Sequence, residues 1–363
     1  MTEPISISRV TRIGHIERLG QWFPRQRVLE LDREGFPLRG PGRHQLEGEL
    51  PWIFWDMSPS GYLGRKLQGQ RPELQLPEDP RCWNAPDVLR VLTAFGADLS
   101  GNLLVGDEAV RQFRELRFSS NPQDHIDLFQ SAGEDAEHAR LTSALGGERP
   151  KVLVTTEAVA NLVKFPPSSH TPLGQRWCDL LRAEALCAQV LARNGVAAAR
   201  SKFSSGLGQL LVVERFDRIA PRGRVGVGTL YFLAMERWGE VRITGPEVLR
   251  RLHAEKLVDA ASVETCTRVH AFSEAIGNDD AHLGNYALLF DDAGAATLAP
   301  IYDVLPMIFA PRNDELPDQR ITPRATPIDP AVAPWVDALV RAVETEPGIS
   351  QGFKDLWLRY VGA

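Results

Sequence analysis

The sequence predicts an α+β protein built from three successive units. Its 363 residues suffice for two or three domains, at roughly 100–200 residues per domain. Residues 126–218 combine β-branched runs with one helical stretch, whereas residues 219–363 consist mostly of helical periods interrupted by loops. Residues 1–125 mix short apolar clusters with many Pro, Gly, Arg and Trp, which predicts short strands and helices. Strands in one segment and helices in the next are typical of the α+β class.

Three strands and one helix are expected in the middle unit. Residues 151–155 form a β-branched run, residues 159–165 alternate loosely, and residues 209–216 (QLLVVERF) follow a Ser/Gly turn. Residues 175–194 carry apolar side chains at helical spacing and are followed by Gly195, a residue that commonly ends a helix.

The last unit is expected to be helical around one short hairpin. Helices are predicted over about 262–276, where Gly277 provides the stop, and near 332–344 and 350–361. Residues 286–290 and 296–298 flank the sequence DDAG and predict a hairpin. The segment 306–334 carries many Pro and Arg residues and is expected to be loop.

Composition excludes several classes of protein. Hydrophobic residues make up 43% and charged residues 24%, so disorder is excluded as the dominant state. No apolar run approaches the roughly 20 residues of a membrane span, and no secretory leader precedes the first unit, so a cytoplasmic location is expected. Four scattered cysteines without a C-x-x-C pair disfavour disulfides and a cysteine-based zinc site. A net charge of −6 disfavours a generally basic nucleic-acid binder.

Acidic and amide side chains gather directly after the predicted helix that ends at Ile276. The stretch IGNDDAHLGN ends at Asn285, and a second acid, Asp303, follows in APIYDVL. Asp280 precedes Asn285 by 5 positions and Asp303 by 23. Phosphoryl transfer needs a carboxylate that orients the attacking hydroxyl, together with hard oxygen ligands for Mg²⁺. The alternative interpretation is an Asx-rich turn that caps a helix, with Asp303 as another cap.

A lysine and a glutamate of the middle unit are candidates for a buried ion pair. Lys164 ends the apolar run AVANLVKF, from which it could reach nucleotide phosphates, although a lysine at a strand end usually points to water. Glu184 lies on the apolar stripe of the predicted helix, where an unpaired carboxylate would be costly. Pairing with Lys164 would remove that cost, and a strand-to-helix Lys–Glu pair is a recurring part of kinase sites.

Two further segments are candidate nucleotide contacts. Gly146 and Gly147 precede Lys151 and the first predicted strand, where a glycine pair can bring backbone N–H groups close to a phosphate. The segment does not fit the Walker-type loop pattern. Residues 214–218 (ERFDR) end the third strand, at the place where a two-lobed kinase has its hinge. Backbone groups there can bind adenine and a following acid can reach ribose; the alternative is an edge strand of alternating charge.

Together these motifs resemble those of the HipA-like serine/threonine kinases, the toxins of bacterial toxin–antitoxin pairs. That family has a glycine loop, a strand lysine, a helix glutamate, an ERFDR hinge, an N-x-D-x-H-x-x-N catalytic loop and a Tyr-Asp metal motif. The matching segments here are 147–151, Lys164, Glu184, 214–218, 278–285 and 302–303. The stretches LPWIFWDMSPSGYLGR and DLSGNLLVGDEA near the N-terminus resemble the YjjJ (HipH) branch.

The resemblance implies a two-lobed, protein-kinase-like (HipA-like) α+β fold with an additional N-terminal subdomain and a mainly helical C-lobe. It implies ATP and Mg²⁺ as cofactors, with Asp280 as the catalytic residue and Asn285 and Asp303 as metal ligands. His282 is expected to tie the catalytic loop to backbone carbonyls. The nucleotide contacts that it implies are Gly146, Gly147, Lys151, Lys164, Glu184, Glu214 and Phe216 through backbone groups, Asp217 toward ribose, and His282.

The same resemblance implies a protein substrate, with an aminoacyl-tRNA synthetase or another translation factor as the natural class. It also implies a HipB-like antitoxin as a partner. Direct nucleic-acid binding and membrane association are not expected. In relatives a serine of the glycine loop is autophosphorylated; Ala144 stands there in this chain, so that switch is either lost or moved to Thr142 or Ser143.

Two rival functions remain open on sequence grounds. One is a metal-dependent nuclease or phosphohydrolase that uses Asp279, Asp280, His282 and Asp303. The other is a pseudokinase that only binds a nucleotide or a partner. Gly284, where many relatives have a lysine, and the short C-terminal unit keep this second rival open.

Overall fold

The first unit is an antiparallel sheet covered by helices. The computed structural model describes residues 3–116, 151–155, 159–166, 170–205 and 209–362. Its first sheet has the order β4-β3-β2-β1-β5, with strands β1 (Ile5–Val10), β2 (Ile16–Phe23), β3 (Val28–Leu31), β4 (Gly42–Gln45) and β5 (Leu103–Val105). Its helices are α1 (Trp52–Met57), α2 (Gly61–Gln70), α3 (Ala85–Phe95) and α4 (Asp107–Glu115). The predicted mixture of short strands and helices is confirmed.

The middle unit is a four-stranded antiparallel sheet with one long helix. The strands β6 (Lys151–Thr155), β7 (Ala160–Lys164), β9 (Leu210–Glu214) and β8 (Ser201–Ser204) lie in the order β6-β7-β9-β8. Helix α6 (Pro172–Arg193) begins at Thr171, whose side chain accepts a hydrogen bond from the backbone N–H of Gly174. The three predicted strands and the helix are confirmed. The edge strand β8 was not predicted, because its sequence SKFS lacks a β-branched run.

The last unit is mainly helical, as predicted. Its helices are α7 (Leu230–Trp238), α8 (Gly245–Ala254), α9 (Ala260–Ile276), α10 (Ala333–Thr345) and α11 (Gln351–Val361). Its strands β12 (Gly226–Thr229), β13 (Ala287–Phe290) and β14 (Ala296–Leu298) form one sheet, in which β13 and β14 are the predicted hairpin. Short 3₁₀ turns cover Leu283–Asn285, Met307–Phe309 and Asp318–Arg320. At the C-terminus of α9, Gly277 adopts a φ of +79° and caps the helix as predicted.

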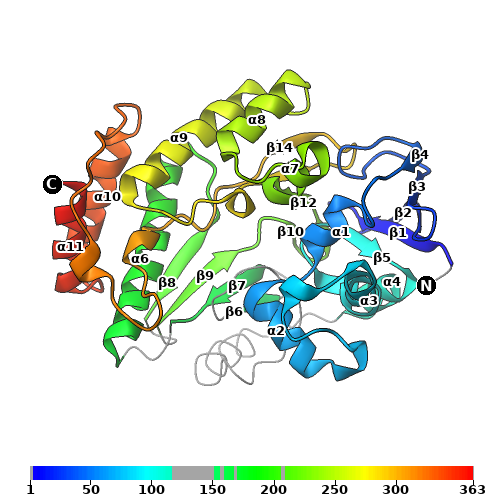
Figure 1. Cartoon of the computed structure of the whole chain (residues 1–363), viewed down its shortest axis with the longest axis horizontal. Helices are drawn as coiled ribbons and strands as arrows, with labels where there is room; N and C mark the ends of the chain where they lie inside the picture. The colour runs from blue at the N-terminus through cyan, green and yellow to red at the C-terminus, as the bar shows by residue number, and fades with distance from the viewer. Residues whose placement is uncertain (1–2, 117–150, 156–158, 167–169, 206–208, 363) are drawn as a thin grey trace.

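The last unit extends across the molecule, from α7 and β12 beside the first unit to α10 and α11 beside α6 (Figure 1). The first unit and the N-terminus lie at one end, and α10, α11 and the C-terminus lie at the other. The boundary predicted at residue 125 falls in the segment 117–150, outside the described residues. Two very short strands, β10 (Arg218–Ile219) and β11 (Gly223–Arg224), lead from the middle unit into the last one.

The first unit packs on the last through the indole ring of Trp52, which lies against strand β12 and its glycines. Trp52 of α1 lies against Phe290 of β13, with ring centroids 6.3 Å apart. A Cβ atom at Gly228 would lie 2.5 Å from the Trp52 ring, so only glycine permits this approach. The carboxylate of Asp56 accepts hydrogen bonds from the Thr229 backbone N–H (2.6 Å) and hydroxyl (2.5 Å) and so caps α7 from another unit. Burial raises the pKa of Asp56 to about 6.

A buried ionic cluster joins the first unit to the end of β9. Asp98 accepts from the guanidinium of Arg218 at 2.7 Å and from that of Arg215 at 3.3 Å. Asp217 accepts from the same two arginines at 2.8 and 2.9 Å. Arg224 lies 3.5 Å from Asp98. Burial acts to raise the pKa of both carboxyl groups, but the arginines outweigh it and hold both pKa values below the ordinary range.

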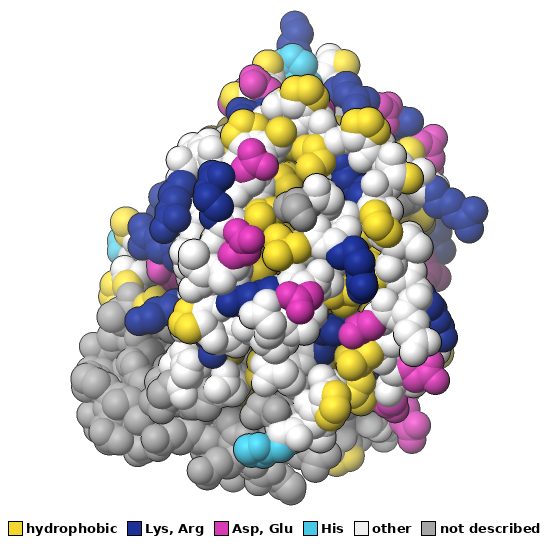
Figure 2. All heavy atoms as spheres, turned by 90° about the vertical axis from the view of Figure 1, so that its left-hand side faces the viewer, with side chains coloured by type: hydrophobic (Ala, Val, Ile, Leu, Met, Phe, Trp, Pro, Cys, Tyr) yellow, Lys and Arg dark blue, Asp and Glu magenta, His cyan; other side chains and the backbone are white. Residues whose placement is uncertain are grey.

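The molecular surface carries both signs of charge. On the face shown in Figure 2, lysines and arginines are interspersed with acidic side chains, and hydrophobic side chains show between them. In the described part of the chain, no helix is long and apolar enough to cross a membrane.

The cluster should be essential for stability. We expect Asp98→Asn to lower the free energy of unfolding by about 3–5 kcal/mol, because three buried arginines would then share one carboxylate. Urea denaturation followed by tryptophan fluorescence measures the loss. The control is Asp79→Asn, which makes the same chemical change in an exposed pair with Arg81 and should leave the midpoint nearly unchanged. Equal midpoints for the two variants would show that the cluster does not hold the units together.

Candidate active site

The centre of the candidate site is a lysine held between two carboxylates. The Nζ atom of Lys164, at the end of β7, lies 2.7 and 2.9 Å from the two carboxylate oxygens of Glu184 in α6. The same atom lies 2.6 Å from Oδ1 of Asp303, which follows β14. The side chains of Lys164 and Glu184 are 11% and 6% exposed. The predicted buried pair is therefore confirmed, and the structure adds Asp303 as a third member.

The charges in this triad depend on one another. Burial acts to lower the pKa of Lys164, but the two carboxylates outweigh it and hold the ammonium charged. Burial raises the pKa of Glu184 to about 7, although Lys164 opposes the shift. Asp303 is 41% exposed, and Lys164 holds its pKa below the ordinary value against the effect of burial. One ammonium therefore stabilises the Asp303 carboxylate more than the deeper Glu184 carboxylate.

Lys151 lies beside the triad. It is 7% exposed and directly opposite Lys164 in the β6–β7 register. Its charge acts to lower the pKa of both Glu184 and Asp303. The structure thus brings this predicted phosphate contact to the same place as Lys164. The predicted glycines Gly146 and Gly147, together with Thr142, Ser143 and Ala144, lie outside the described residues.

The segment after α9 places Asp280 at the surface near Asp303. Asp280 is 55% exposed; partial desolvation raises its pKa, which His282 opposes and the like charge of Asp303 reinforces. The side-chain amide of Asn285 donates to the Asp280 backbone carbonyl at 2.8 Å, an interaction that orients the amide within the loop. Its oxygen is then the atom available to a cation. An amide oxygen and a nearby carboxylate are the ligand types that Mg²⁺ prefers.

His282 holds the loop in a different way from the one expected. Its Nδ1 accepts a hydrogen bond from the Gly284 backbone N–H at 3.0 Å, whereas donation to backbone carbonyls was expected. Nδ1 is therefore unprotonated in this arrangement, and Nε2 lies 4.0 Å from Oδ1 of Asp280. A Cβ atom at Gly284 would lie 2.8 Å from Cε1 of His282, so a lysine at position 284 would displace the imidazole.

Tyr302 links Asp303 to this loop, a role that the sequence did not indicate. Its hydroxyl donates to the Gly284 carbonyl at 2.9 Å, and its ring lies 5.6 Å from that of Phe216. Asp303 itself adopts a φ of +58°, which is uncommon for a residue other than glycine. Such backbone strain persists where the surroundings hold it, and it concentrates at functional sites.

The structure places the three predicted hinge residues in different surroundings. Phe216 packs against Tyr302, so the strand end reaches the site. Glu214 is half-exposed and lies 3.6 Å from Arg200. Asp217 was expected to face ribose, and this is corrected: the residue is buried, and its carboxylate accepts hydrogen bonds from Arg215, Arg218 and the Gly101 backbone N–H. Asp217 lies in the turn after β9, where its bond to the Gly101 backbone N–H holds it toward the first unit.

The structure does not bring the acidic residues proposed for a nuclease into one metal-binding group among the residues that it describes. Asp279 forms an ion pair with Arg312, a residue of the long loop that the sequence gave no reason to single out. Among the residues that the structure describes, no three His, Cys, Asp or Glu side chains are grouped to hold a metal ion. An Asn–Asp pair, such as Asn285 and Asp303, is a different kind of site and stays a prediction.

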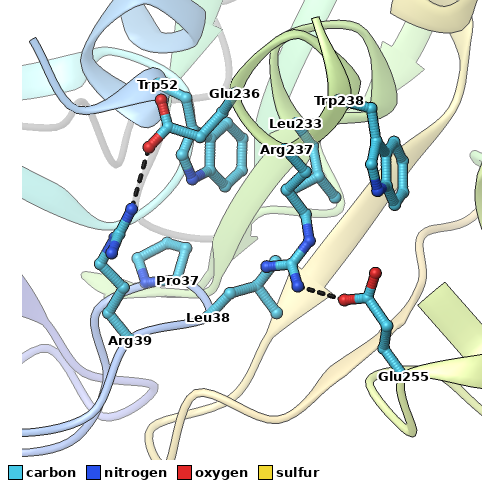
Figure 3. A pocket seen from close by; sticks show the side chains of 9 residues that line it. All are labelled: Pro37, Leu38, Arg39, Trp52, Leu233, Glu236, Arg237, Trp238 and Glu255. Carbon is cyan, nitrogen blue, oxygen red and sulfur yellow. Dashed lines mark hydrogen bonds and ion pairs between the residues drawn. The ribbon is translucent and has the colours of Figure 1, made fainter. Parts of the chain in front are cut away.

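A cavity of about 300 Å³ lies away from these residues. It lies between the loop that carries Leu38 and helix α7, and Trp52, Leu38 and Trp238 line it (Figure 3). Two ion pairs, Arg39–Glu236 and Arg237–Glu255, cross its rim. None of the predicted site residues lines it.

Comparison with known proteins gives matches along most of the chain. The family model for the YjjJ-like toxin middle domain matches residues 1–114, and that for the HipA-like C-terminal domain matches residues 143–342. Toxin YjjJ of Escherichia coli (strain K12) is 30% identical over 334 residues, which cover 87% of this chain and 74% of that protein. The chain therefore belongs to the HipA-like toxins, in their YjjJ-type branch.

Two solved structures resemble the fold. HipA of Shewanella oneidensis MR-1, solved with HipB and operator DNA, has a TM-score of 0.54 at 14% identity, covering 99% of this chain and 93% of its own. The Helicobacter pylori proinflammatory kinase CtkA has a TM-score of 0.44 at 13% identity, covering 60% of this chain and 88% of its own. The likeness to the Shewanella protein confirms the predicted HipA-like α+β fold.

Removal of the central lysine should produce a pH-dependent defect. We expect Lys164→Met to lower the free energy of unfolding by about 3–5 kcal/mol at pH 8, because two carboxylates would lose their shared cation. Much of the loss should return at pH 5. The folded-state pKa of Glu184 lies above its ordinary value of 4.5 even beside Lys164, and loss of the lysine raises it further. The cost of Glu184 therefore accumulates as the pH rises from about 4.5 toward the folded-state pKa, and it is larger at pH 8 than at pH 5.

Urea midpoints at pH 5 and pH 8 test this expectation. Lys202→Met removes an exposed lysine from the neighbouring strand β8 and serves as the matched control, with little change at either pH. A Lys164→Met defect of equal size at both pH values would contradict the assigned charges.

Proposed function

We propose that this toxin is an ATP- and Mg²⁺-dependent serine/threonine protein kinase. The single observation that carries the proposal is the contact of one buried lysine with both Glu184 and Asp303. A strand lysine paired with a helix glutamate, next to a metal-binding aspartate, is the arrangement that positions nucleotide phosphates in protein kinases. The family membership and the HipA-like fold support the same assignment.

Each side chain has a specific task in this proposal. Mg²⁺ bound to the oxygens of Asn285 and Asp303 would neutralise the charge of the triphosphate. Lys164 would stay bonded to Glu184 but would exchange its contact with Asp303 for one with the phosphates. Lys151 would add a second positive charge nearby. Backbone groups of Glu214 and Phe216 bind adenine, with the Phe216 ring held by Tyr302.

The exposed carboxylate of Asp280 orients the attacking hydroxyl of the substrate. As the bond between that oxygen and the γ-phosphorus forms, the bond from the γ-phosphorus to the leaving oxygen of ADP breaks, and the hydroxyl proton passes to Asp280. Its raised pKa suits a group that must accept a proton. The half-exposed position of Asp280 suits a large substrate such as a protein, which has to approach from outside.

The biological role follows from the family. We propose growth arrest by phosphorylation of a protein substrate, with an aminoacyl-tRNA synthetase or another translation factor as the natural class. A HipB-like antitoxin is the proposed partner, because the Shewanella relative was solved with HipB. The pseudokinase alternative stays open because Gly284 leaves the loop without the cation that many relatives carry at this position.

Asp280 is the residue that separates binding from chemistry. We expect Asp280→Asn to bind Mg²⁺-ATP as the wild type does but to lose phosphate transfer by about 10²–10⁴-fold. Transfer of labelled phosphate, including autophosphorylation, measures activity, and calorimetry measures binding. Asp279→Asn, a neighbouring change of the same kind, should keep the activity. Full activity in Asp280→Asn would refute this role, and a wild type that binds ATP without any transfer would establish the pseudokinase.

Asp303 should instead control the metal dependence of binding. We expect Asp303→Asn to bind ATP with the same affinity in the presence and absence of Mg²⁺, because the charged ligand is lost. In the wild type, Mg²⁺ should tighten ATP binding by at least about tenfold. A titration of ATP at fixed Mg²⁺ and in EDTA, on both proteins, decides between these outcomes; an undiminished Mg²⁺ effect in Asp303→Asn would place the metal elsewhere.

A further inference from the structure

Helix α1 of the first unit is connected to the site loop, which we define as residues 278–286, the segment that carries Asp280 and Asn285. The helix packs against α7 and β12, and both of these elements contact the 3₁₀ turn Leu283–Asn285 within the loop (Figure 1). The only charged residue of α1, Asp56, bonds at the junction of β12 and α7. Asp56 takes no part in the proposed chemistry, so its presence at this junction calls for another explanation.

The carboxylate of Asp56 lacks a cationic partner. Both of its hydrogen bonds come from Thr229, at 2.6 Å from the backbone N–H and at 2.5 Å from the hydroxyl. No lysine or arginine in the described part of the chain forms an ion pair with it. Burial raises the pKa of Asp56 to about 6, so the surroundings work against the charged form. A carboxylate that is kept at such a cost is a candidate for a functional role.

One contact that fixes the site loop begins beside Thr229. The next residue, Leu230, donates its backbone N–H to the carbonyl of Tyr286 at 2.9 Å, at the end of the site loop. Thr229 itself pairs with Ala287 in the β12–β13 register. Because Asp56 binds both the N–H and the hydroxyl of Thr229, it fixes the point at which β12 ends and α7 begins, and with it the donor that holds Tyr286.

A second contact that fixes the site loop comes from Tyr302, whose hydroxyl donates to the Gly284 carbonyl at 2.9 Å. Burial raises the pKa of this hydroxyl, and the negative charges of Asp56 and Asp303 act in the same direction. Asp56 therefore lies close enough to Tyr302 to act on it, and its charge favours the protonated, donating form of the hydroxyl. One carboxylate of the first unit thus supports two contacts that hold the loop.

We propose that Asp56 is a positioning residue for the site loop, which it supports through its bonds to Thr229 and its charge near Tyr302. The side chains that depend on this position are Asp280, which orients the substrate hydroxyl, and the proposed metal ligand Asn285. Their placement matters because an error of about 1 Å in such groups can lower a rate by about a hundredfold. The inference rests on the proposed kinase function for its effect on phosphate transfer, whereas the effect on the loop itself does not.

Hydrogen exchange of the full chain, measured by mass spectrometry without nucleotide, tests the loop directly. We expect Asp56→Ala to speed the exchange of the amides of residues 283–287 by at least about tenfold, because the loop opens more often. Asp56→Asn should recover most of the protection, since its amide oxygen can still accept the bond from the Thr229 N–H. Asp259→Ala is the control for lost stability. It removes a carboxylate that caps α9 by accepting from the Ser262 backbone N–H at 2.8 Å, and it should leave these amides unchanged.

Phosphate transfer separates positioning from a general loss of structure. In Asp56→Ala the transfer rate should fall about ten- to a hundredfold while the affinity for ATP in EDTA stays within about twofold, because the proposed contacts with adenine and Lys164 lie outside the loop. A parallel loss of ATP affinity would indicate general damage and count against a positioning role. A wild type without transfer would contradict the kinase function alone, and the exchange rates would still decide the role of Asp56.

Two exchange results overturn the inference. One is unchanged exchange at residues 283–287 in Asp56→Ala, and the other is an equal acceleration in Asp259→Ala. If Asp56→Ala does not fold, Thr229→Val removes only the bond from the hydroxyl and should speed exchange several-fold. Unchanged exchange in that variant would equally rule out the role.

Discussion

The contact of Lys164 with Glu184 and Asp303 is the interaction on which the rest of the structure depends. The Nζ atom of Lys164 in β7 thereby holds helix α6 and the segment after β14 together. Because breaking a buried ion pair costs several kcal/mol, these three elements cannot separate without losing that energy. The same contact sets the place of Asp280, since Tyr302, next to Asp303, bonds to the loop that carries it. Stability and the proposed chemistry therefore share one group of atoms.

The ERFDR segment serves two surfaces at once. Phe216 turns toward the site and packs on Tyr302, whereas Arg215 and Asp217 turn toward the first unit and bond to Asp98 and Gly101. The segment that follows β9 is thus fixed on both sides. The first unit consequently supports the segment that follows β9.

Local sequence patterns predicted the helices and strands well. Contacts between residues far apart in the sequence could not be predicted from such patterns. The strand Lys151–Thr155 and the stop at Gly277 follow from side-chain type and backbone freedom alone. The Lys164–Glu184 pair could be predicted because an unpaired acid on an apolar stripe demands a partner. Asp217 was misassigned because its partner Gly101 lies 116 positions away, and no local pattern shows which face a strand turns to another unit. The glycine strand Gly226–Thr229 depends on the distant Trp52 in the same way.

A crystal structure of the full chain with Mg²⁺ and a non-hydrolysable ATP analogue tests the central claim most directly. We expect Nζ of Lys164 to move away from Oδ1 of Asp303, now 2.6 Å distant, and to contact the phosphates while it stays bonded to Glu184. Asp303 and Asn285 should then share the metal ion. A nucleotide bound elsewhere, or a Lys164–Asp303 contact that is unchanged with nucleotide in place, would contradict it.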